Sequence, residues 1–274
     1  VTQINLAIAT ALASGITGGV AFLYYADRLF QLPLGVIGVA IGVVLLPTLA
    51  RKLRANDTQG ALDSQNRALE FALFLTLPAA AALIIIGRPI LHTVYEHGAF
   101  TRADTLAVAP ALAAFAAGLP AFTLTKIFQP GFYAREDTKT PMYFAMATVA
   151  VNIIASIVLV KLYSHVGIAL ATSIAAWLNA LALIAMSLRR GFYTSDQRFR
   201  SRLPRILLSV AIMAGVLWAL LRYGLAGHYA EGAGFAAALY GLLALLAAGI
   251  ISYFAAAHVS GAFRLGELKR SLRR

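Results

Sequence analysis

Eight long apolar stretches constrain the fold of this chain more than any other feature of its sequence. A helix needs about 20 mostly apolar residues to cross the hydrocarbon core of a bilayer. The runs are long and their apolar residues do not alternate, which excludes membrane-spanning strands. The sequence therefore predicts an all-α, polytopic membrane protein with eight transmembrane helices. The stretches cover approximately residues 3–25, 34–50, 69–87, 105–128, 141–161, 166–188, 206–224 and 233–257.

The composition agrees with a membrane protein and argues against an enzyme. Hydrophobic residues make up 60% of the chain and charged residues 12%, whereas a soluble domain has about 45–50% and about 25%. The chain has no cysteine, so disulfides and cysteine-ligated metals are excluded. No nucleophile–base arrangement, metal-ligand spacing or phosphate-binding loop is recognisable. We predict a non-enzymatic protein without a catalytic residue, metal or cofactor.

The basic residues predict the orientation of the chain. With the N-terminus inside, eighteen of the 23 lysines and arginines fall in inside segments and five in outside segments. Cytoplasmic loops are enriched in these residues, so both termini are expected in the cytoplasm. The net charge of +12 then reflects topology, and no nucleic-acid partner is predicted. The tail 259–274 is basic and is expected on the anionic inner leaflet.

Asp27 and Arg28 are the only charged residues among the first 50. A charge at the bilayer centre costs on the order of 3 kcal/mol. The pair therefore either lies in a turn at the outer interface, with Arg28 reaching the headgroups, or faces a wet cavity. The segment Gln31–Gly35, QLPLG, is expected to break the chain between two spans. The next span carries a stripe of small residues that lets a neighbouring helix approach closely: Gly35, Gly38 and Gly42.

Several other polar residues lie inside or at the ends of the spans. Lys126 can add positive potential to a cavity or reach the inner interface. Asn152 and Ser156 are four residues apart and share a helix face, and Thr172 lies in the next span. They form either a small cation site or, as the lack of a deep carboxylate favours, hydrogen bonds between helices. Glu70 opens the third span and is expected at the interface.

Three segments resemble the MurJ (MviN) family of lipid II flippases. They are YYADRLFQLPLGVIGVAIGVVLLPTLA, YEHGAFTRADT and QPGFYAREDTKTP, which begin at Tyr24, Tyr95 and Gln129. The family has fourteen spans, in two six-helix lobes plus two extra helices. The eight stretches match the second lobe and the extra pair, so the resemblance implies a C-terminal portion that lacks its N-terminal lobe. The chain starts at Val1 without a charged leader, and we interpret this start as a cut.

The resemblance implies a division of the chain and a fold. The expected fold resembles the C-terminal lobe of the multidrug/oligosaccharidyl-lipid/polysaccharide exporter fold. Residues 1–189 are expected to form the six-helix lobe and 190–205 a basic cytoplasmic connection. Residues 206–258 would be the two extra transmembrane helices, and 259–274 the cytoplasmic tail. The extra helices either help form a groove for a polyprenyl tail or simply face lipid.

The resemblance also implies a function: alternating-access transfer of lipid II from the inner to the outer leaflet of the bacterial plasma membrane. Arg28 takes the position of a cavity arginine, and its planar fork matches the oxygens of a pyrophosphate. Asp27 would orient Arg28 or balance its charge, and Lys126 would add a second cation. Some members carry an Asp where Ala9 stands here, which puts ion coupling through this helix in doubt.

Two alternatives remain open at the level of sequence. One is an exporter of the same superfamily for another lipid-linked oligosaccharide or a drug. A drug-cation exporter should carry acidic groups in its cavity, whereas this site is basic. The other is a non-transporting membrane scaffold for cell-wall synthesis, which would not need Arg28.

Overall fold

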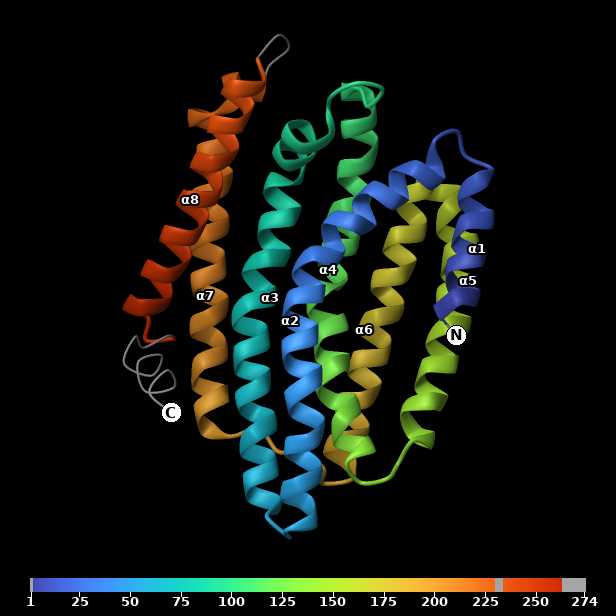
Figure 1. The fold of residues 1–274 in the computed structure, drawn as a ribbon, viewed down its shortest axis with the longest axis vertical. Coiled ribbons are helices and arrows are strands. Elements are labelled where there is room, and N and C mark those ends of the chain that lie inside the picture. The colour runs from blue at the N-terminus through green and yellow to red at the C-terminus, as the bar shows by residue number, and fades with distance from the viewer. Residues whose placement is uncertain (1, 230–233, 263–274) are drawn as a thin grey trace.

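The computed structural model describes residues 2–229 and 234–262. Its helices lie side by side as one bundle (Figure 1). Seven of them are long and apolar enough to cross a membrane, and α1 is shorter. The predicted all-α, polytopic architecture is therefore confirmed for the described residues. The α-helices are α1 (Thr2–Ser14), α2 (Gly19–Arg54), α3 (Thr58–Tyr95), α4 (Arg102–Tyr133), α5 (Lys139–Tyr163), α6 (His165–Arg189), α7 (Gln197–Ala219) and α8 (Phe235–Val259), with short segments η1 (Leu220–Gly224) and η2 (Ala226–Tyr229) between the last two.

The first turn of the bundle lies earlier in the sequence than predicted. The chain turns between α1 and α2. Gly18 adopts a positive φ of 74° in this turn, a backbone conformation that residues other than glycine rarely adopt. Helix α2 then continues through Pro33 without interruption, since membrane helices tolerate proline. The predicted break at Gln31–Gly35 is therefore wrong. Asp27 and Arg28 lie inside a helix, so the turn, one of the two alternatives considered for them, does not occur.

Helix α4 lies at the centre of the bundle and packs against α2, α3 and α6. Its buried side chains include Leu112, Phe115 and Phe128, and Phe115 stacks against Phe30 of α2 at 5.7 Å between ring centroids. Helix α5 packs on α6 at the edge of the lobe and buries few residues. Helices α7 and α8 pack on each other and on α3. The lobe is thus organised around α4, and α3 joins it to the last two helices.

The loops divide between two ends of the bundle. The loops 55–57, 134–138 and 190–196 lie together at one end, at the bottom of Figure 1, and we call this the basic end because of the arginines and lysines around it. The loops 15–18 and 96–101 lie at the opposite end. Helix α3 begins directly after the loop 55–57 and is capped by Asp57, which accepts a hydrogen bond of 2.8 Å from the Gly60 N–H.

The segment 190–205 is shorter as a loop than expected, because α7 begins at Gln197. The side chain of Asp196 caps this helix by accepting a hydrogen bond of 2.7 Å from the Phe199 N–H. Residues 263–274 of the predicted basic tail lie outside the described residues.

Side chains of the α4–α5 loop, within the segment 129–141, contact the segment that follows α6. The Arg135 guanidinium donates to the carbonyls of Gly131 at 2.7 Å and Phe192 at 3.3 Å, and lies over the Phe192 ring. Asp137 pairs with Arg190 and accepts a hydrogen bond of 3.0 Å from the Thr140 N–H. The hydrogen bond from the Thr140 backbone is the main reason why the pKa of the Asp137 carboxyl is held below its usual range.

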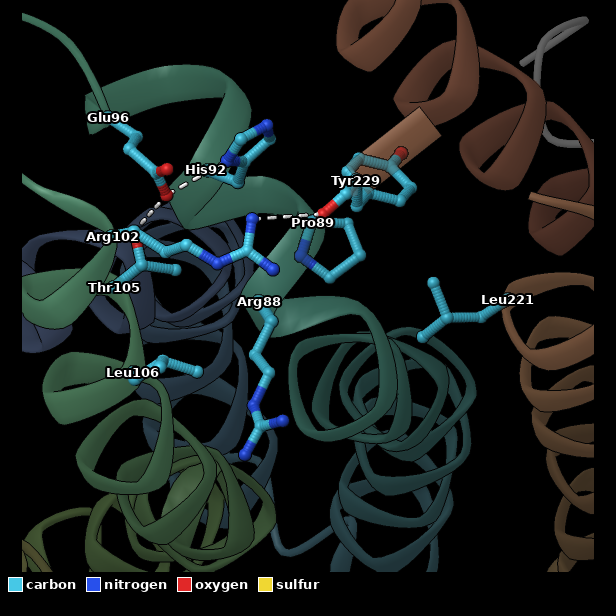
Figure 2. Close-up of a pocket in the computed structure, with 9 residues that line it drawn as sticks. All are labelled: Arg88, Pro89, His92, Glu96, Arg102, Thr105, Leu106, Leu221 and Tyr229. Atoms are coloured by element: carbon cyan, nitrogen blue, oxygen red, sulfur yellow. Dashed lines mark hydrogen bonds and ion pairs between the residues drawn. The ribbon is translucent and has the colours of Figure 1, made fainter. Parts of the chain in front are cut away.

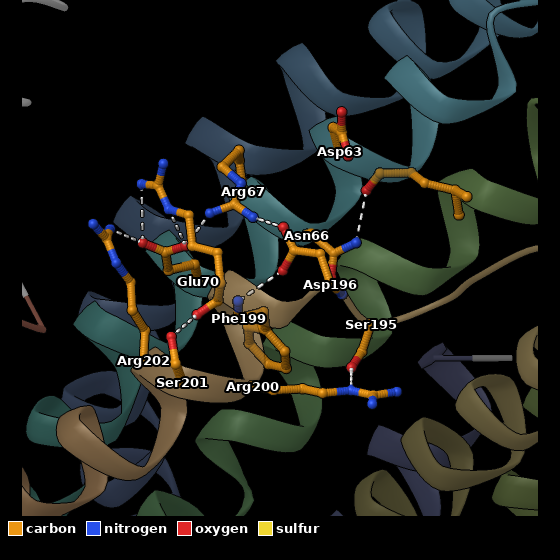
Figure 3. Close-up of polar contacts among 12 residues, drawn as sticks. Asp63, Asn66, Arg67, Glu70, Ser195, Asp196, Phe199, Arg200, Ser201 and Arg202 are labelled. Atoms are coloured by element: carbon orange, nitrogen blue, oxygen red, sulfur yellow. Dashed lines mark hydrogen bonds and ion pairs between the residues drawn. The ribbon is translucent and has the colours of Figure 1, made fainter.

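Polar contacts join the last two helices to the lobe at both ends. At the opposite end, Arg102 of α4 donates a hydrogen bond of 3.2 Å to the carbonyl oxygen of Tyr229 in η2 (Figure 2). At the basic end, Glu70 of α3 accepts hydrogen bonds from Arg198 and Arg202 of α7 and from Arg67 of its own helix (Figure 3). Glu70 is only 8% exposed, so it is a buried ion-pair partner, which its sequence position did not predict.

A second group of hydrogen bonds extends this cluster. Asn66 of α3 accepts a hydrogen bond from the Tyr193 hydroxyl at 2.9 Å and donates to the Thr194 carbonyl at 2.9 Å. Arg67 also pairs with Asp196. Two adjacent turns of α3 therefore hold the segment between α6 and α7.

We expect Glu70→Gln to destabilise the protein by about 1.5–3 kcal/mol, because it removes the charged acceptor of the hydrogen bonds from the arginines, of which Arg202 is the least exposed. Thermal unfolding in lipid nanodiscs should show a lower melting temperature. Asp63→Asn is the matched control, since Asp63 is exposed on the same helix and accepts only a local hydrogen bond from Gln59. Equal melting temperatures for the two variants would contradict a stabilising role of the cluster.

Candidate functional site

A cavity of about 370 Å³ lies between α1, α2, α4 and α6. Its walls are partly apolar, with Phe115 and Ile168 among the lining side chains. Its lining residues include one carboxylate, Asp27. The polar lining comes from three helices: Thr10, Tyr24, Asp27, Gln31 and Thr172. The cavity thus has the mixed lining that is typical of small-molecule sites.

Asp27 and Arg28 use different partners, although they are adjacent in sequence. The Gln31 amide donates a hydrogen bond to Asp27, which lines the cavity. Arg28 is exposed and donates from Nη2 to the Tyr24 hydroxyl at 2.7 Å, with its guanidinium carbon 4.7 Å from the centre of the Tyr24 ring. Tyr24 also lines the cavity. The side chain that orients Arg28 in this structure is therefore Tyr24, at the rim of the cavity.

Lys126 comes from α4, and its side chain lies against Gly38 of α2. A Cβ atom at position 38 would be 2.8 Å from the Lys126 Cδ and would also collide with its Nζ. A Cβ at Gly35 or Gly42 would meet nothing within 4 Å. Of the three glycines in the predicted stripe, only Gly38 is packed closely by another side chain, that of Lys126. We call the space at Gly38 that the lysine side chain fills the notch. Gly38 is ten residues beyond Arg28, so the two cations are about 15 Å apart along the helix axis.

The predicted polar cluster joins α5 to α6 and reaches the cavity. Asn152 is buried and donates to the Thr172 hydroxyl at 3.4 Å. The Ser156 hydroxyl donates to the Asn152 side chain at 3.0 Å, and the Thr172 hydroxyl donates to the Ile168 carbonyl at 3.0 Å. Thr172 lines the same cavity as Asp27. The structure therefore brings together two sets of residues that the sequence placed in separate spans.

No group of three or more His, Asp or Glu side chains that could hold a metal ion occurs among the described residues. The cluster of Asn152, Ser156 and Thr172 contributes uncharged oxygen atoms, and Ala9 lines the cavity beside it. These residues form hydrogen bonds with one another, which is the interhelical arrangement favoured from the sequence.

Three residues of this region were not singled out as site residues from the sequence. Gln31 and Tyr24 each lie four residues from their partner, which places them on one helix face, so their contacts were recoverable from spacing alone. Gly38 was assigned to helix packing. Its role in receiving Lys126 depends on how α2 and α4 lie against each other, and spacing carries no signal for that contact.

Comparison with known proteins gives one consistent family. A sequence model of the lipid II flippase MurJ matches residues 1–240. A probable lipid II flippase MurJ of Rhizobium meliloti is 45% identical over 274 residues, which are the whole of this chain and 51% of that protein. The Burkholderia cenocepacia protein named lipid II flippase MurJ is 32% identical over 84% of this chain and 45% of its own length.

A solved structure agrees with the sequence comparison. It is a lipid II flippase MurJ in an inward closed conformation, which superposes with a TM-score of 0.77 at 28% identity and covers 99% of this chain and 52% of its own. The chain thus spans about half the length of the relatives it matches. It belongs to the lipid II flippase MurJ family, whose members are multi-pass proteins of the bacterial inner membrane.

Proposed function

We propose that this chain is the second half of a lipid II flippase. Together with an N-terminal lobe, it would carry lipid II from the inner to the outer leaflet by alternating access. The observation that carries this proposal is the alignment of the whole chain with a relative named a probable lipid II flippase. No bond is made or broken, so the residues of the site bind and orient the cargo.

Arg28 is the residue that we assign to the pyrophosphate. Its hydrogen bond to Tyr24 uses Nη2, so Nε and Nη1 would be available to the oxygens of a bound anion. Arginine presents donors in a planar fork that matches phosphate oxygens. Its exposure on α2 leaves it accessible to a cargo between the two lobes. Asp27 would compensate this charge from within the cavity while the site is empty.

Lys126 would supply a second cation, from α4, beside α2. Its ammonium group lies at Gly38, about 15 Å from Arg28 along α2. A pyrophosphate cargo moving along α2 would meet the two charges in turn. Asn152, Ser156 and Thr172 would hold α5 and α6 together beside the cavity as the lobe moves.

An apolar groove between α3, α7 and α8 supports a site for the polyprenyl tail. Its volume is about 210 Å³, and its lining is almost wholly aliphatic and aromatic, with Ile86, Leu217, Leu245 and Tyr253 among its side chains. Burial of each methylene group contributes about 0.8 kcal/mol, so even a short length of tail would gain affinity there.

The proposed orientation places the basic end in the cytoplasm, following the enrichment of cytoplasmic loops in lysine and arginine. The partners are then lipid II, the bilayer lipids and the N-terminal lobe. Residues 1–189 would form the second lobe, residues 190–205 its connection to the extra pair 206–258, and the tail 259–274 would lie on the inner leaflet.

We expect Arg28→Ala to reduce transport strongly. Loss of a charge-assisted hydrogen bond costs about 1.5–3 kcal/mol, or roughly tenfold or more in binding. The chain would be joined to the N-terminal half of the Rhizobium meliloti relative and tested for growth of cells depleted of their own flippase. Arg222→Ala, at an exposed arginine in η1, is the matched control.

The same assay separates the alternatives. Full growth with Arg28→Ala would remove the anion site and favour a scaffold. The purified wild-type chimaera would also be tested in vesicles. If it transports another lipid-linked oligosaccharide but not lipid II, the cargo is different from the one proposed.

Gly38→Ala should displace Lys126 and reproduce the transport defect of Lys126→Met, because its Cβ would occupy the space of the lysine side chain. Gly35→Ala is the matched control, since the space there is open. Flipping rates of the three variants would be compared in vesicles after equal reconstitution. A normal rate for Gly38→Ala, with Lys126→Met impaired, would show that the notch does not position the lysine.

A further inference from the structure

A second polar pocket lies at the end of the bundle opposite the basic end. It has a volume of about 240 Å³ and lies between the lobe and the connection from α7 to α8. Figure 2 shows the charged side chains that line it, which come from α3, α4 and the turn after α3: Arg88, His92, Glu96 and Arg102. Pro89, Leu106 and Leu221 contribute apolar walls. None of these residues belongs to the proposed cargo path.

The carboxylate in this pocket is already engaged. Glu96 accepts a hydrogen bond of 2.7 Å from the Thr105 hydroxyl and lies 2.8 Å from the His92 Nδ1. Burial raises the pKa of the Glu96 carboxyl, but these hydrogen bonds and the nearby charges outweigh it and hold the pKa below its usual value. Glu96 is therefore ionised and tied to α4 and to its own helix.

The two arginines are placed differently. Arg102 donates to the Tyr229 carbonyl, so it joins the lobe to η2. Arg88 is exposed and, in Figure 2, extends away from the His92–Glu96 pair. No hydrogen bond or ion pair of Arg88 occurs with any residue in the described part of the chain. The pocket thus presents a guanidinium without a protein anion.

The backbone of α3 is irregular on both sides of Arg88. Helix α3 is kinked at Ile86, where φ is −105° and ψ is 17°. Pro89 follows three residues later and cannot donate a backbone hydrogen bond to the preceding turn. The kink lies two residues before Arg88. Arg88 lines the pocket from the turn that follows this kink, without a counter-ion among the described residues.

We propose that this pocket binds the phosphate group of an anionic phospholipid, with Arg88 as the principal contact and Arg102 beside it. Phosphate oxygens match the donor fork of arginine, and the end of a membrane-spanning helix lies at the depth of the headgroups. The apolar walls suit the glycerol and first methylene groups of such a lipid. The bound lipid would bridge α3 and α4 to the η1–η2 connection and would stabilise the docking of the last two helices. The site does not depend on the transport proposal.

The test is thermal unfolding of the 274-residue chain in nanodiscs of phosphatidylcholine with increasing fractions of phosphatidylglycerol. The melting temperature of the wild type should rise as the fraction of phosphatidylglycerol increases. Arg88→Gln should need about tenfold more phosphatidylglycerol for the half-maximal gain, which corresponds to about 1.4 kcal/mol. Arg222→Gln removes the same charge from an exposed site at the same end of the bundle and should respond as the wild type does.

Two further measurements test whether the ligand is a lipid and whether the guanidinium of Arg88 binds it. Inorganic phosphate added to phosphatidylcholine nanodiscs should not reproduce the gain, and an equal gain would overturn the assignment to a lipid. Arg88→Lys keeps the charge without the fork and should give an intermediate response, so the comparison holds even if Arg88→Gln lowers the melting temperature in phosphatidylcholine alone. Equal lipid responses of Arg88→Gln and Arg222→Gln would overturn the site.

Discussion

A polar side chain inside an apolar helix must find a partner, because the surrounding hydrocarbon offers none. In this bundle most such side chains find it one turn away on their own helix. Arg28 contacts Tyr24, Gln31 contacts Asp27 and Ser156 contacts Asn152, each four residues apart. Threonine hydroxyls follow the same rule and donate to backbone carbonyls four residues earlier, as at Thr76 and Thr123. Local partners keep these residues satisfied while leaving the helices free to pack through apolar surfaces.

Contacts of charged side chains with residues distant in sequence concentrate instead at the ends of the bundle. Glu70 is bound by arginines of α3 and α7 at the basic end, and Arg102 holds η2 at the other. The apolar groove between α3, α7 and α8 lies between these two points. The last two helices are therefore fixed to the lobe at both ends, while the middle of their interface presents an apolar surface suited to a hydrocarbon tail.

The continuous helix α2 carries or contacts the residues that we propose for transport. It brings Asp27 to the cavity wall, holds Arg28 at the rim through Tyr24, and receives Lys126 at Gly38. Had the chain broken at Gln31–Gly35, Arg28 and Gly38 would have belonged to separate elements. Arg28 is carried by α2 and Lys126 by α4, so a movement of α2 relative to α4 would change the separation of the two cations. Such a change suits a mechanism in which a charged cargo passes between two lobes.

The sequence by itself determined the class of fold and the position of most spans, because long apolar runs have few stable structures in a bilayer. It also determined the short-range contacts of Asp27, Asn152 and Ser156, since four-residue spacing places side chains on one helix face. Only the tertiary structure decided the turn between α1 and α2, the burial of Glu70, the notch that receives Lys126 and the joint cavity of Asp27 and Thr172. Each of these features depends on which helices become neighbours. Helix neighbours are determined by the packing of several helices together, and no single stretch of sequence encodes that packing.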